Sequence, residues 1–191
     1  MSVQERRERE RAERRRLIVR TARELAESEG WDAVTTRRLS ELVQYSQPVL
    51  YSHFKGKAEI VAAVAVEALG DLAAELRAAR EKAADDVSAL RAVARTYMDF
   101  AAAHPAAYDA MFVQRIDVTF GTDESPQALH DAFHEIVSVL RPFAGDRDLE
   151  TFAEVGWSWL HGLATLTKGE RLRPDHSASR LDLLVDALCR G

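Results

Sequence analysis

The sequence predicts an all-α protein, and three observations support this fold class. Apolar residues recur three and four positions apart along most of the chain, which is the spacing of one helix face. Only 9 Gly and 5 Pro interrupt the 191 residues, fewer than a fold with many turns would need. No alternation of apolar and polar residues, the pattern of a half-buried strand, continues over more than four residues.

The first apolar helix is expected to start at Leu17 and to end before Gly30, a residue type common just after a helix C-terminus. Upstream, residues 5–16 are charged on all sides. They predict either a frayed helix held by Glu–Arg pairs or a disordered arm, and a basic arm of this kind could lie along a DNA groove. Trp31 and Val34 are placed to cover the end of the first helix.

Two short helices are expected between residues 35 and 54. Thr35 and Thr36 form the N-cap region of the first, whose predicted apolar face is Leu39, Leu42 and Val43. Ser46 begins the second and Pro48 falls in its first turn, with Val49, Leu50 and Phe54 as the buried face. Two helices of about eight residues joined by a short turn would form a helix-turn-helix.

The rest of the chain predicts further helices, broken at proline and glycine positions. Their expected ranges are 57–84, 86–103, 106–115, 126–141, 148–168 and 177–189, and 116–125 is expected to be a loop. We therefore expect two domains, an N-terminal three-helix domain over 1–60 with the helix-turn-helix at about 35–54, and a helical domain over 61–191.

Charge is distributed unevenly along the chain. Residues 1–57 carry 13 Lys and Arg against 9 Asp and Glu, whereas residues 58–191 carry 13 against 22. A basic end on an acidic body suggests that a polyanion contacts the N-terminal part, although an Arg- and Ala-rich coding bias would give part of this pattern.

The residues from 35 to 57 suit contact with a phosphate backbone. Helix N-termini at Thr36, Ser46 and Gly56 offer free N–H groups, and anions are favoured there. Tyr45 and Gln47 are placed to reach base edges, since Gln can bond adenine in two places. A helical hairpin on the surface of a bundle is the alternative.

The segments Leu39-Ser-Glu-Leu-Val43, Ser46-Gln-Pro-Val-Leu-Tyr-Ser-His-Phe54 and Lys55-Gly-Lys57 resemble the helix-turn-helix signature of the tetracycline-repressor (TetR) family, over about 17–64. More weakly, His104-Pro-Ala-Ala-Tyr-Asp-Ala-Met-Phe112 and Trp157-Ser-Trp-Leu-His-Gly162 resemble the ligand-domain motifs of the subgroup named for its Trp-His-Gly (WHG) residues. Two positions depart from the family pattern: Gln44 replaces a glycine in the turn, and Val49 replaces a small polar residue.

The resemblance implies a ligand-responsive, homodimeric repressor that binds double-stranded operator DNA in the cytoplasm and is not an enzyme. It implies phosphate contacts at positions matching Thr36, Tyr51, His53 and Lys57, and base contacts at 44–48. The DNA-binding candidates are Thr36, Arg37, Gln44, Tyr45, Ser46, Gln47, Pro48, Tyr51, His53 and Lys57.

The resemblance also implies a cavity for a small apolar or aromatic effector in the helical domain. The candidate lining residues, each of which could instead be ordinary core, are Tyr97, Phe100, Tyr108, Met111, Phe112, Trp157 and His161. Dimerisation is implied through 148–168 and 177–189, where Gly156 and Gly162 would allow close helix approach. The apolar face Leu181, Leu184, Val185 and Leu188 fits either that interface or packing within the chain.

Other classes of protein are less compatible with the sequence. The longest apolar run, residues 60–66, is too short to span a membrane, no secretory signal is expected, and the lone Cys189 indicates a reducing compartment. No cofactor motif occurs. His130 and His134, four residues apart on one expected helix, leave open a metal-binding protein or enzyme, although no third ligand is evident.

Overall fold

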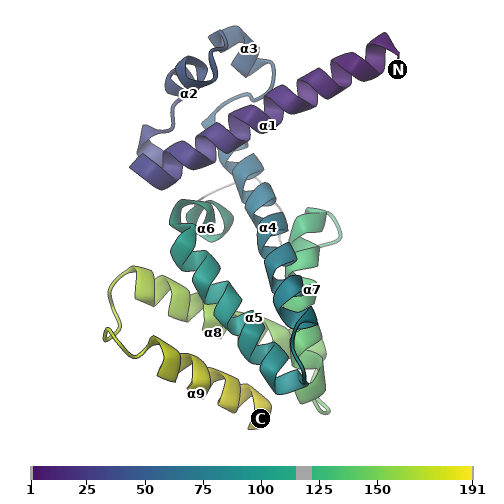
Figure 1. The fold of residues 1–191 in the computed structure, drawn as a ribbon, viewed down its shortest axis with the longest axis vertical. Helices are drawn as coiled ribbons and strands as arrows, with labels where there is room; N and C mark the ends of the chain where they lie inside the picture. Colours follow the sequence, from purple (N-terminus) through teal and green to yellow (C-terminus); the bar gives the residue numbers. More distant parts are fainter. Residues whose placement is uncertain (1, 115–121, 191) are drawn as a thin grey trace. The chain divides into compact units, whose positions relative to one another are not determined.

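The computed structural model describes residues 2–114 and 122–190, and these residues form helices and turns without any strand, which confirms the all-α fold class (Figure 1). No helix within these ranges is long and apolar enough to cross a membrane. The helices, with two short 3₁₀ segments labelled η, are α1 (Val3–Glu29), η1 (Trp31–Ala33), α2 (Thr36–Val43), α3 (Gln47–Tyr51), α4 (Lys57–Glu81), α5 (Asp86–Ala103), α6 (Pro105–Phe112), α7 (Gln127–Leu140), η2 (Arg141–Phe143), α8 (Leu149–Lys168) and α9 (Ser177–Arg190).

The chain divides into two compact units. The first contains Met1–Ala68 and Ala106–Thr119, and the second contains Leu69–Pro105 and Phe120–Gly191. Both α4 and α6 therefore contribute residues to each unit. The expected division into 1–60 and 61–191 stays a prediction, and nothing in the sequence indicated that residues after 105 return to the first unit.

In the first unit, α1 is one continuous helix, so the charged segment 5–16 is helical rather than an extended arm. Its N-terminus is held by a capping box, in which the Ser2 hydroxyl accepts from the Glu5 amide and the Glu5 carboxylate accepts from the Ser2 amide. The helix ends as predicted at Gly30, whose φ of 82° is accessible to glycine. Its C-terminal half packs an apolar stripe into the core, consisting of Ile18, Val19, Ala22, Leu25 and Ala26.

Two predictions for the helix-turn-helix need correction. The second helix, α3, has five residues rather than about eight, because the chain turns at Ser52 and His53. Leu42 was expected to be buried but is 53% exposed. Successive residues on a helix are 100° apart, so when Leu39 and Val43 face the core, Leu42 points away from it.

Within the first unit, the N-terminal residues of α6 are hydrogen-bonded to the end of α1 and to η1. The Glu27 carboxylate accepts hydrogen bonds from the backbone amides of Ala106 and Ala107, each at 2.9 Å. The Trp31 indole N–H donates to the Ala106 carbonyl, also at 2.9 Å. A carboxylate at a helix N-terminus is favoured because it pairs with amides that have no partner inside the helix.

The second unit packs α5, α7, α8 and α9 around an apolar core. The face of α9 that fitted two interpretations is buried inside this unit, with Leu181, Leu184, Val185 and Leu188 all 6% exposed or less. Gly156 allows close packing inside this unit, because a Cβ there would lie 2.7 Å from Cδ1 of Leu140. A Cβ at Gly162 would meet nothing within 4 Å. Of the expected loop 116–125, residues 116–121 lie outside the described residues.

Candidate nucleic-acid interface

The turn between α2 and α3 adopts the geometry that the sequence required. Gln44 has φ 56° and ψ 37°, the left-handed conformation in which glycine is usual. The amides of Gln44 and Tyr45 both donate to the Ser40 carbonyl, which closes the end of α2. A non-glycine residue in this conformation costs on the order of 1 kcal/mol, so these contacts offset local strain.

The two helices of the motif are joined by a pair of hydroxyl groups. The Thr36 side chain, in the first turn of α2, lies 3.3 Å from the Tyr51 hydroxyl at the end of α3. Tyr51 is half exposed. These are two of the four residues for which the resemblance implied phosphate contacts, and their oxygens lie close enough to approach neighbouring oxygens of one anion.

Beside this pair lies an open groove of about 330 Å³. Its lining combines predicted DNA-contacting residues with two others, and consists of Arg37, Ser40, Glu41, Gln44, Tyr45 and Gln47. The Arg37 guanidinium donates to Glu41 at 3.1 Å. Glu41 was not anticipated as part of this surface, although its i, i+4 spacing from Arg37 was a readable signal.

The remaining DNA-binding candidates are also at the surface of the first unit. Ser46 is the N-cap of α3 without a side-chain capping bond, and Pro48 occupies the first turn; both are exposed. The Lys57 ammonium donates to the Trp31 carbonyl. The His53 ring is half-buried, and its Nδ1 has no hydrogen-bond partner among the described residues.

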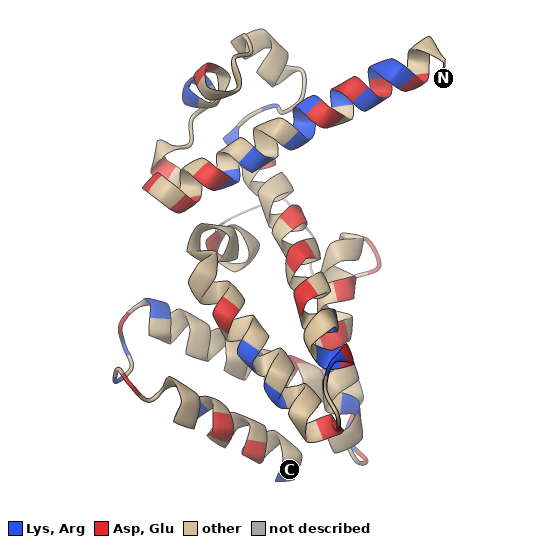
Figure 2. Ribbon diagram, in the orientation of Figure 1, with Lys and Arg blue, Asp and Glu red and all other residues tan. Residues whose placement is uncertain are grey.

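Three arginines of α1 act on His53; they belong to the basic segment 5–16 that could lie along a DNA groove, but their position beside His53 was not predicted. The Arg11 guanidinium donates to the Ser52 carbonyl at 3.4 Å, and the Arg15 guanidinium lies over the Phe54 ring at 4.8 Å. Burial first, and then the positive charges of Arg11, Arg14 and Arg15, lower the pKa of His53 below its ordinary value of 6.5. Figure 2 shows the alternating basic and acidic residues of this part of α1.

The effector-binding candidates fall into both units. Tyr97, Phe100, Trp157 and His161 belong to the second, whereas Tyr108, Met111 and Phe112 belong to the first. In the second unit, the Trp157 indole N–H donates to the Tyr97 hydroxyl at 3.0 Å, and the Trp157 ring also contacts the His161 and Phe133 rings. Burial lowers the pKa of His161. Tyr97 and Phe100 are each 2% exposed, as core residues would be.

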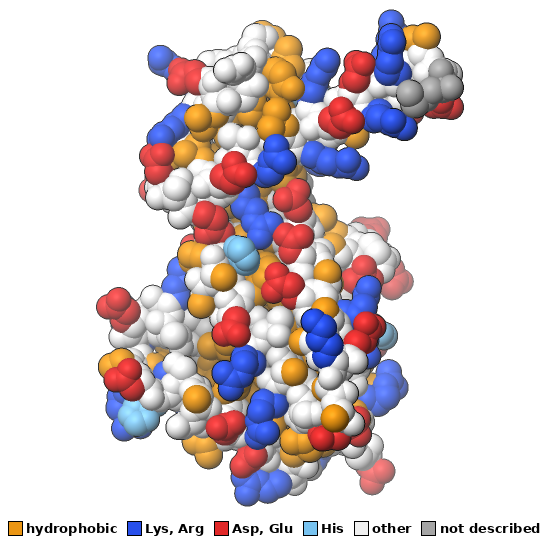
Figure 3. All heavy atoms as spheres, viewed as in Figure 1, with side chains coloured by type: hydrophobic (Ala, Val, Ile, Leu, Met, Phe, Trp, Pro, Cys, Tyr) orange, Lys and Arg blue, Asp and Glu red, His pale blue; other side chains and the backbone are white. Residues whose placement is uncertain are grey.

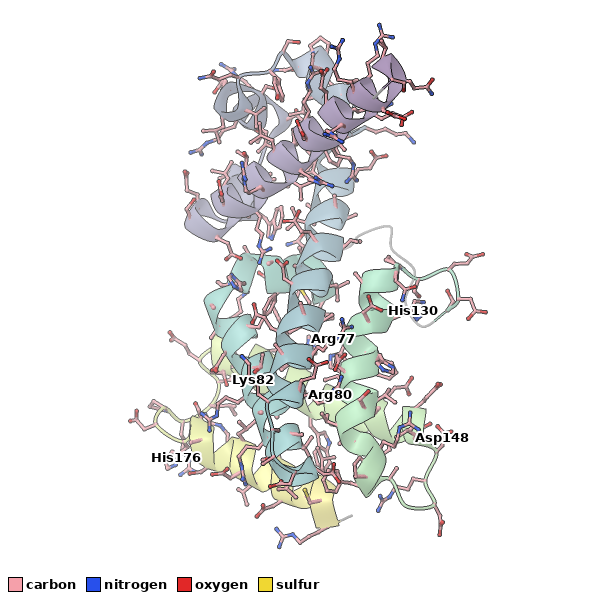
Figure 4. The ribbon with its side chains drawn as sticks, turned by 45° about the vertical axis from the view of Figure 1, so that its right-hand side comes forward. Arg77, Arg80, Lys82, His130, Asp148 and His176 are labelled. Atoms are coloured by element: carbon pink, nitrogen blue, oxygen red, sulfur yellow. The ribbon has the colours of Figure 1, made fainter. Side chains whose placement is uncertain are left out.

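A buried carboxylate in the second unit was overlooked by sequence reasoning. Glu135 on α7 is fully buried, and its two oxygens accept from Arg77 at 3.0 Å and from Arg80 at 2.7 Å, both on α4 (Figure 4). Burial raises the pKa of Glu135, but the hydrogen bonds and charges of Arg80 and Arg77 outweigh it, so that the pKa lies below its ordinary value. We call these three residues the Glu135 brace.

The metal alternative finds no support. His130 and His134 both lie on α7 with exposed side chains, and Asp131 between them accepts from Gln127 at 2.9 Å. Within residues 2–114 and 122–190, no group of three or more His, Cys, Asp or Glu side chains is arranged to hold a metal ion.

An apolar stripe is exposed on the outer face of α8. Val155, Trp159 and Leu166 are 43%, 44% and 44% exposed, and with Gly162 they follow the i, i+4, i+7, i+11 spacing of one helix face. Exposed large apolar groups on one face mark a candidate contact surface. We call these four residues the α8 stripe.

Comparison with protein families gives two matches. Residues 18–64 match the family described as "Bacterial regulatory proteins, tetR family". Residues 90–189 match the family described as "Tetracyclin repressor-like, C-terminal domain". The two matches cover the helix-turn-helix and more than half of the chain, respectively.

Curated relatives agree with these matches. The chain is 31% identical to the uncharacterized HTH-type transcriptional regulator YobS of Bacillus subtilis over 123 residues, 64% of this chain and 56% of that protein. It is 45% identical to the class C tetracycline repressor of Escherichia coli over 51 residues, 27% of this chain and 23% of that repressor. The chain thus spans little more than half of YobS and about a quarter of the repressor.

Solved structures share the fold. A protein from Rhodococcus sp. RHA1 superimposes with a TM-score of 0.78 at 23% identity, covering 93% of this chain and 94% of that one. The structure of BioQ with its double-stranded DNA operator gives a TM-score of 0.65 at 20% identity, covering 93% and 98%. Together with the family matches, these observations place the chain: it belongs to the tetR family of bacterial regulatory proteins.

Proposed function

We propose that this protein is a homodimeric transcriptional regulator, a repressor rather than an enzyme, which binds operator DNA and is released by a small molecule. The observation that carries the proposal is the exposed groove beside the Thr36–Tyr51 pair, where Arg37, Gln44 and Gln47 gather on one surface. BioQ, which shares the fold, binds an operator duplex, and this supports the same use of the first unit here.

Within this proposal, two groups of residues have different tasks. Thr36, Tyr51, His53 and Lys57 contact phosphates, which fix the position of the protein without reading sequence. The turn and α3, residues 44–48, face bases in the major groove, where the Gln47 amide can pair with adenine and Pro48 and Val49 can contact thymine methyl groups.

The test is a selection of binding sites from genomic DNA, followed by titrations at several salt concentrations. We expect Tyr51→Ala and Lys57→Ala to weaken binding to every sequence alike, because phosphate contacts do not discriminate between bases. Gln47→Ala should change the preferred sequence, at a cost of about 1–3 kcal/mol at the affected base pair.

Lys82→Ala is the matched control, since it removes one exposed charge in the second unit (Figure 4). It should leave both affinity and site preference unchanged. Recovery of no specific fragment by the wild-type protein, or an affinity that does not change with salt, would refute DNA binding.

We infer that dimerisation uses the α8 stripe together with exposed residues of α9, such as Leu183 at 67% exposure. This inference keeps the ranges 148–168 and 177–189 but changes the residues that carry the contact. Leu184 and Leu188 stabilise the interior of their own unit, so an aspartate at either position would disrupt the fold rather than report on dimerisation.

Trp159→Glu tests the interface without disturbing the core. Sedimentation should show a wild-type dimer at micromolar concentration and a monomer for Trp159→Glu, because a charge would be buried at the interface. Val87→Glu, which places the same charge at another exposed apolar position of the second unit, should remain dimeric. A monomeric wild type would contradict the scheme.

We further propose that the second unit is of the WHG subgroup and that the effector contacts the cluster of Tyr97, Trp157 and His161. The cluster combines apolar rings with a few polar atoms, as small-molecule sites generally do. An apolar or aromatic compound of moderate size fits this chemistry. Phe100, Tyr108, Met111 and Phe112 stay predicted lining residues.

Linkage supplies the test of induction. An inducer must bind the DNA-free protein more tightly, and operator DNA must weaken effector binding by the same factor, commonly 5- to 150-fold. A compound found by thermal-shift screening should therefore bind the free and the operator-bound protein with different affinities, measured by tryptophan fluorescence. Equal affinities would exclude induction by that compound, and unchanged binding to Trp157→Ala would refute the placement of the site.

A further inference from the structure

Four arginines occupy one side of the first half of α1. Arg7, Arg11 and Arg14 follow i, i+4, i+7 spacing, and Arg15 is adjacent to Arg14, so all four continue the helix face that further along carries buried Ile18. We call these four residues the arginine stripe. The other arginines of this segment, Arg6, Arg9 and Arg16, project from the opposite side of the helix.

The stripe is directed toward the end of α3. Arg11 donates to the Ser52 carbonyl, and the Arg15 guanidinium carbon lies over the Phe54 ring, 4.8 Å from its centroid. A guanidinium has five N–H donors, more than these contacts use, and they suit an oxyanion. The stripe therefore joins the surface formed by the helix-turn-helix within the same unit.

His53 lies at this junction, and its environment suits a negatively charged ligand. The positive charges that act on the ring are those of Arg11, Arg14 and Arg15, of which Arg14 also has an exposed partner, Glu10, at 4.0 Å. Three guanidinium groups around an imidazole produce a local excess of positive charge. An oxyanion bound here would reduce that repulsion.

The backbone holds the stripe in a fixed row. The capping box at Ser2 and exposed pairs such as Arg6–Glu10 at 3.8 Å support the helix, although pairs of this kind each contribute only about 0–1 kcal/mol. Arg7 and Arg15 are separated by roughly 12 Å along the helix, the rise of three to four nucleotides of one DNA strand. Figure 3 shows basic side chains interspersed with acidic ones at the surface of the N-terminal part of the chain.

We propose that the arginine stripe forms a binding site for backbone phosphates of the DNA that flanks the half-site contacted by α2 and α3. The proposal rests on the proposed function, because it extends the DNA-binding surface of the first unit. Guanidinium groups along one helix face contact phosphates without reading bases, so the stripe adds affinity and salt dependence but no sequence preference.

The experiment compares two duplexes that carry the same selected operator. One ends at the outer edges of the half-sites, and the other continues for about ten base pairs, one helical turn, on each side. Arg11→Gln/Arg14→Gln should weaken binding to the long duplex at least tenfold at low salt. It should also lower the slope of log affinity against log salt by about 1.8 per protomer, since each phosphate contact contributes about 0.9.

The matched control is Arg6→Gln/Arg9→Gln, which removes the same charge from the opposite face of the same helical segment. The control should bind both duplexes like the wild type, and the stripe variant should bind the short duplex like the wild type. Circular dichroism should show equal helix content in both variants.

Two results would overturn the proposal. The first is an equal loss in both double variants, which would indicate a general effect of net charge. The second is an unchanged salt slope in Arg11→Gln/Arg14→Gln on the long duplex. If the wild type bound the operator normally in either case, only the stripe would be refuted; if the wild type bound no operator, the proposed function would fall together with it.

Discussion

Arginines serve different purposes in the two units, as Arg11 and Arg14 in the first and Arg77 and Arg80 in the second illustrate. The guanidinium groups of the second unit converge on one buried carboxylate, Glu135, at 3.0 and 2.7 Å. In the first unit, Arg11 donates to the Ser52 carbonyl and the neighbouring Arg15 lies over the Phe54 ring, whereas the partner of Arg14, Glu10, is exposed and lies at 4.0 Å. The two guanidinium groups of the second unit therefore share one buried carboxylate, whereas the partners of Arg11 and Arg15 in the first unit carry no negative charge.

Whether an arginine supports the fold or contributes to a recognition surface thus depends on the partner that its guanidinium group meets. The buried Glu135 carboxylate pairs with both guanidinium groups, so they are not available to an external anion. The same two pairs hold α4 against α7. In the first unit the carboxylate partner of Arg14, Glu10, is exposed and 4.0 Å away, so the positive charge remains available to an external anion. Removing charge from each cluster in turn should therefore affect stability in the second unit and DNA binding in the first.

The largest effect is expected from Arg77→Ala/Arg80→Ala. The double variant leaves Glu135 buried without a cation, and breaking a buried pair typically costs 3–5 kcal/mol. We expect about 3 kcal/mol, measured as the free energy of unfolding in urea at pH 7, because both arginines are partly exposed in the native protein.

The pH dependence of this variant identifies the cause. Without the arginines, burial should raise the pKa of Glu135 above its ordinary value. The destabilisation at pH 7 should then shrink as the pH falls and the carboxyl group becomes protonated. Lys82→Ala, on an exposed residue just beyond α4, should cost less than about 0.5 kcal/mol. A pH-independent loss would mean that lost packing, not charge, is responsible.

A smaller effect is expected from Glu27→Ala in the first unit, where the carboxylate pairs with neutral amides instead of cations. The substitution leaves the buried amides of Ala106 and Ala107 without their acceptor, which costs about 1–3 kcal/mol. Glu27→Gln retains one carbonyl acceptor and should lose less. If both variants had the same free energy of unfolding in urea as the wild type, the amides would have found another partner. The Glu27 carboxylate would then contribute nothing to the stability of the first unit.

The local features of the fold were predictable from the sequence because they depend on neighbouring residues. The N-cap at Thr35, the helix end at Gly30 and the strained turn at Gln44 all follow from one or two side chains and their own backbone. The length of α3 and the exposure of Leu42 were not predictable in this way. Both depend on which side of a short helix the remainder of the first unit covers.

The residues of the candidate site likewise fall into a group that the sequence predicts and a group that it does not. The exposed residues 44–48 and the Thr36–Tyr51 pair could be proposed from a motif, since they lie within 16 residues of one another. The arginines beside His53 and the brace on Glu135 join residues about 40 to 60 positions apart. The apolar periodicity of one segment does not predict contacts between distant segments. These pairs are seen only when the helices are packed against one another.

Acid should affect the first unit through His53. Its folded pKa lies below the ordinary 6.5, so the unfolded chain takes up the proton first. Stability is therefore complete above about pH 6.5 and declines as the pH falls through the folded pKa. The decline should be smaller than the effect of Glu27→Ala, because the partly exposed ring is screened by solvent. Melting temperatures between pH 8 and 5 should converge with those of His53→Gln, and parallel curves would exclude His53 as the source.

The smallest effect on stability is expected from Arg11→Gln/Arg14→Gln, the variant with the largest expected effect on DNA binding. Its lost contacts are exposed, namely a 3.4 Å hydrogen bond to the Ser52 carbonyl and a 4.0 Å pair with Glu10. Surface interactions of this kind contribute about 0.5 kcal/mol or less, and relief of repulsion around His53 offsets part of that loss. Urea unfolding without DNA should therefore give a free energy within about 0.5 kcal/mol of the wild type. A loss comparable to that of Arg77→Ala/Arg80→Ala would show that the stripe is itself an internal support, and the contrast between the two units would disappear.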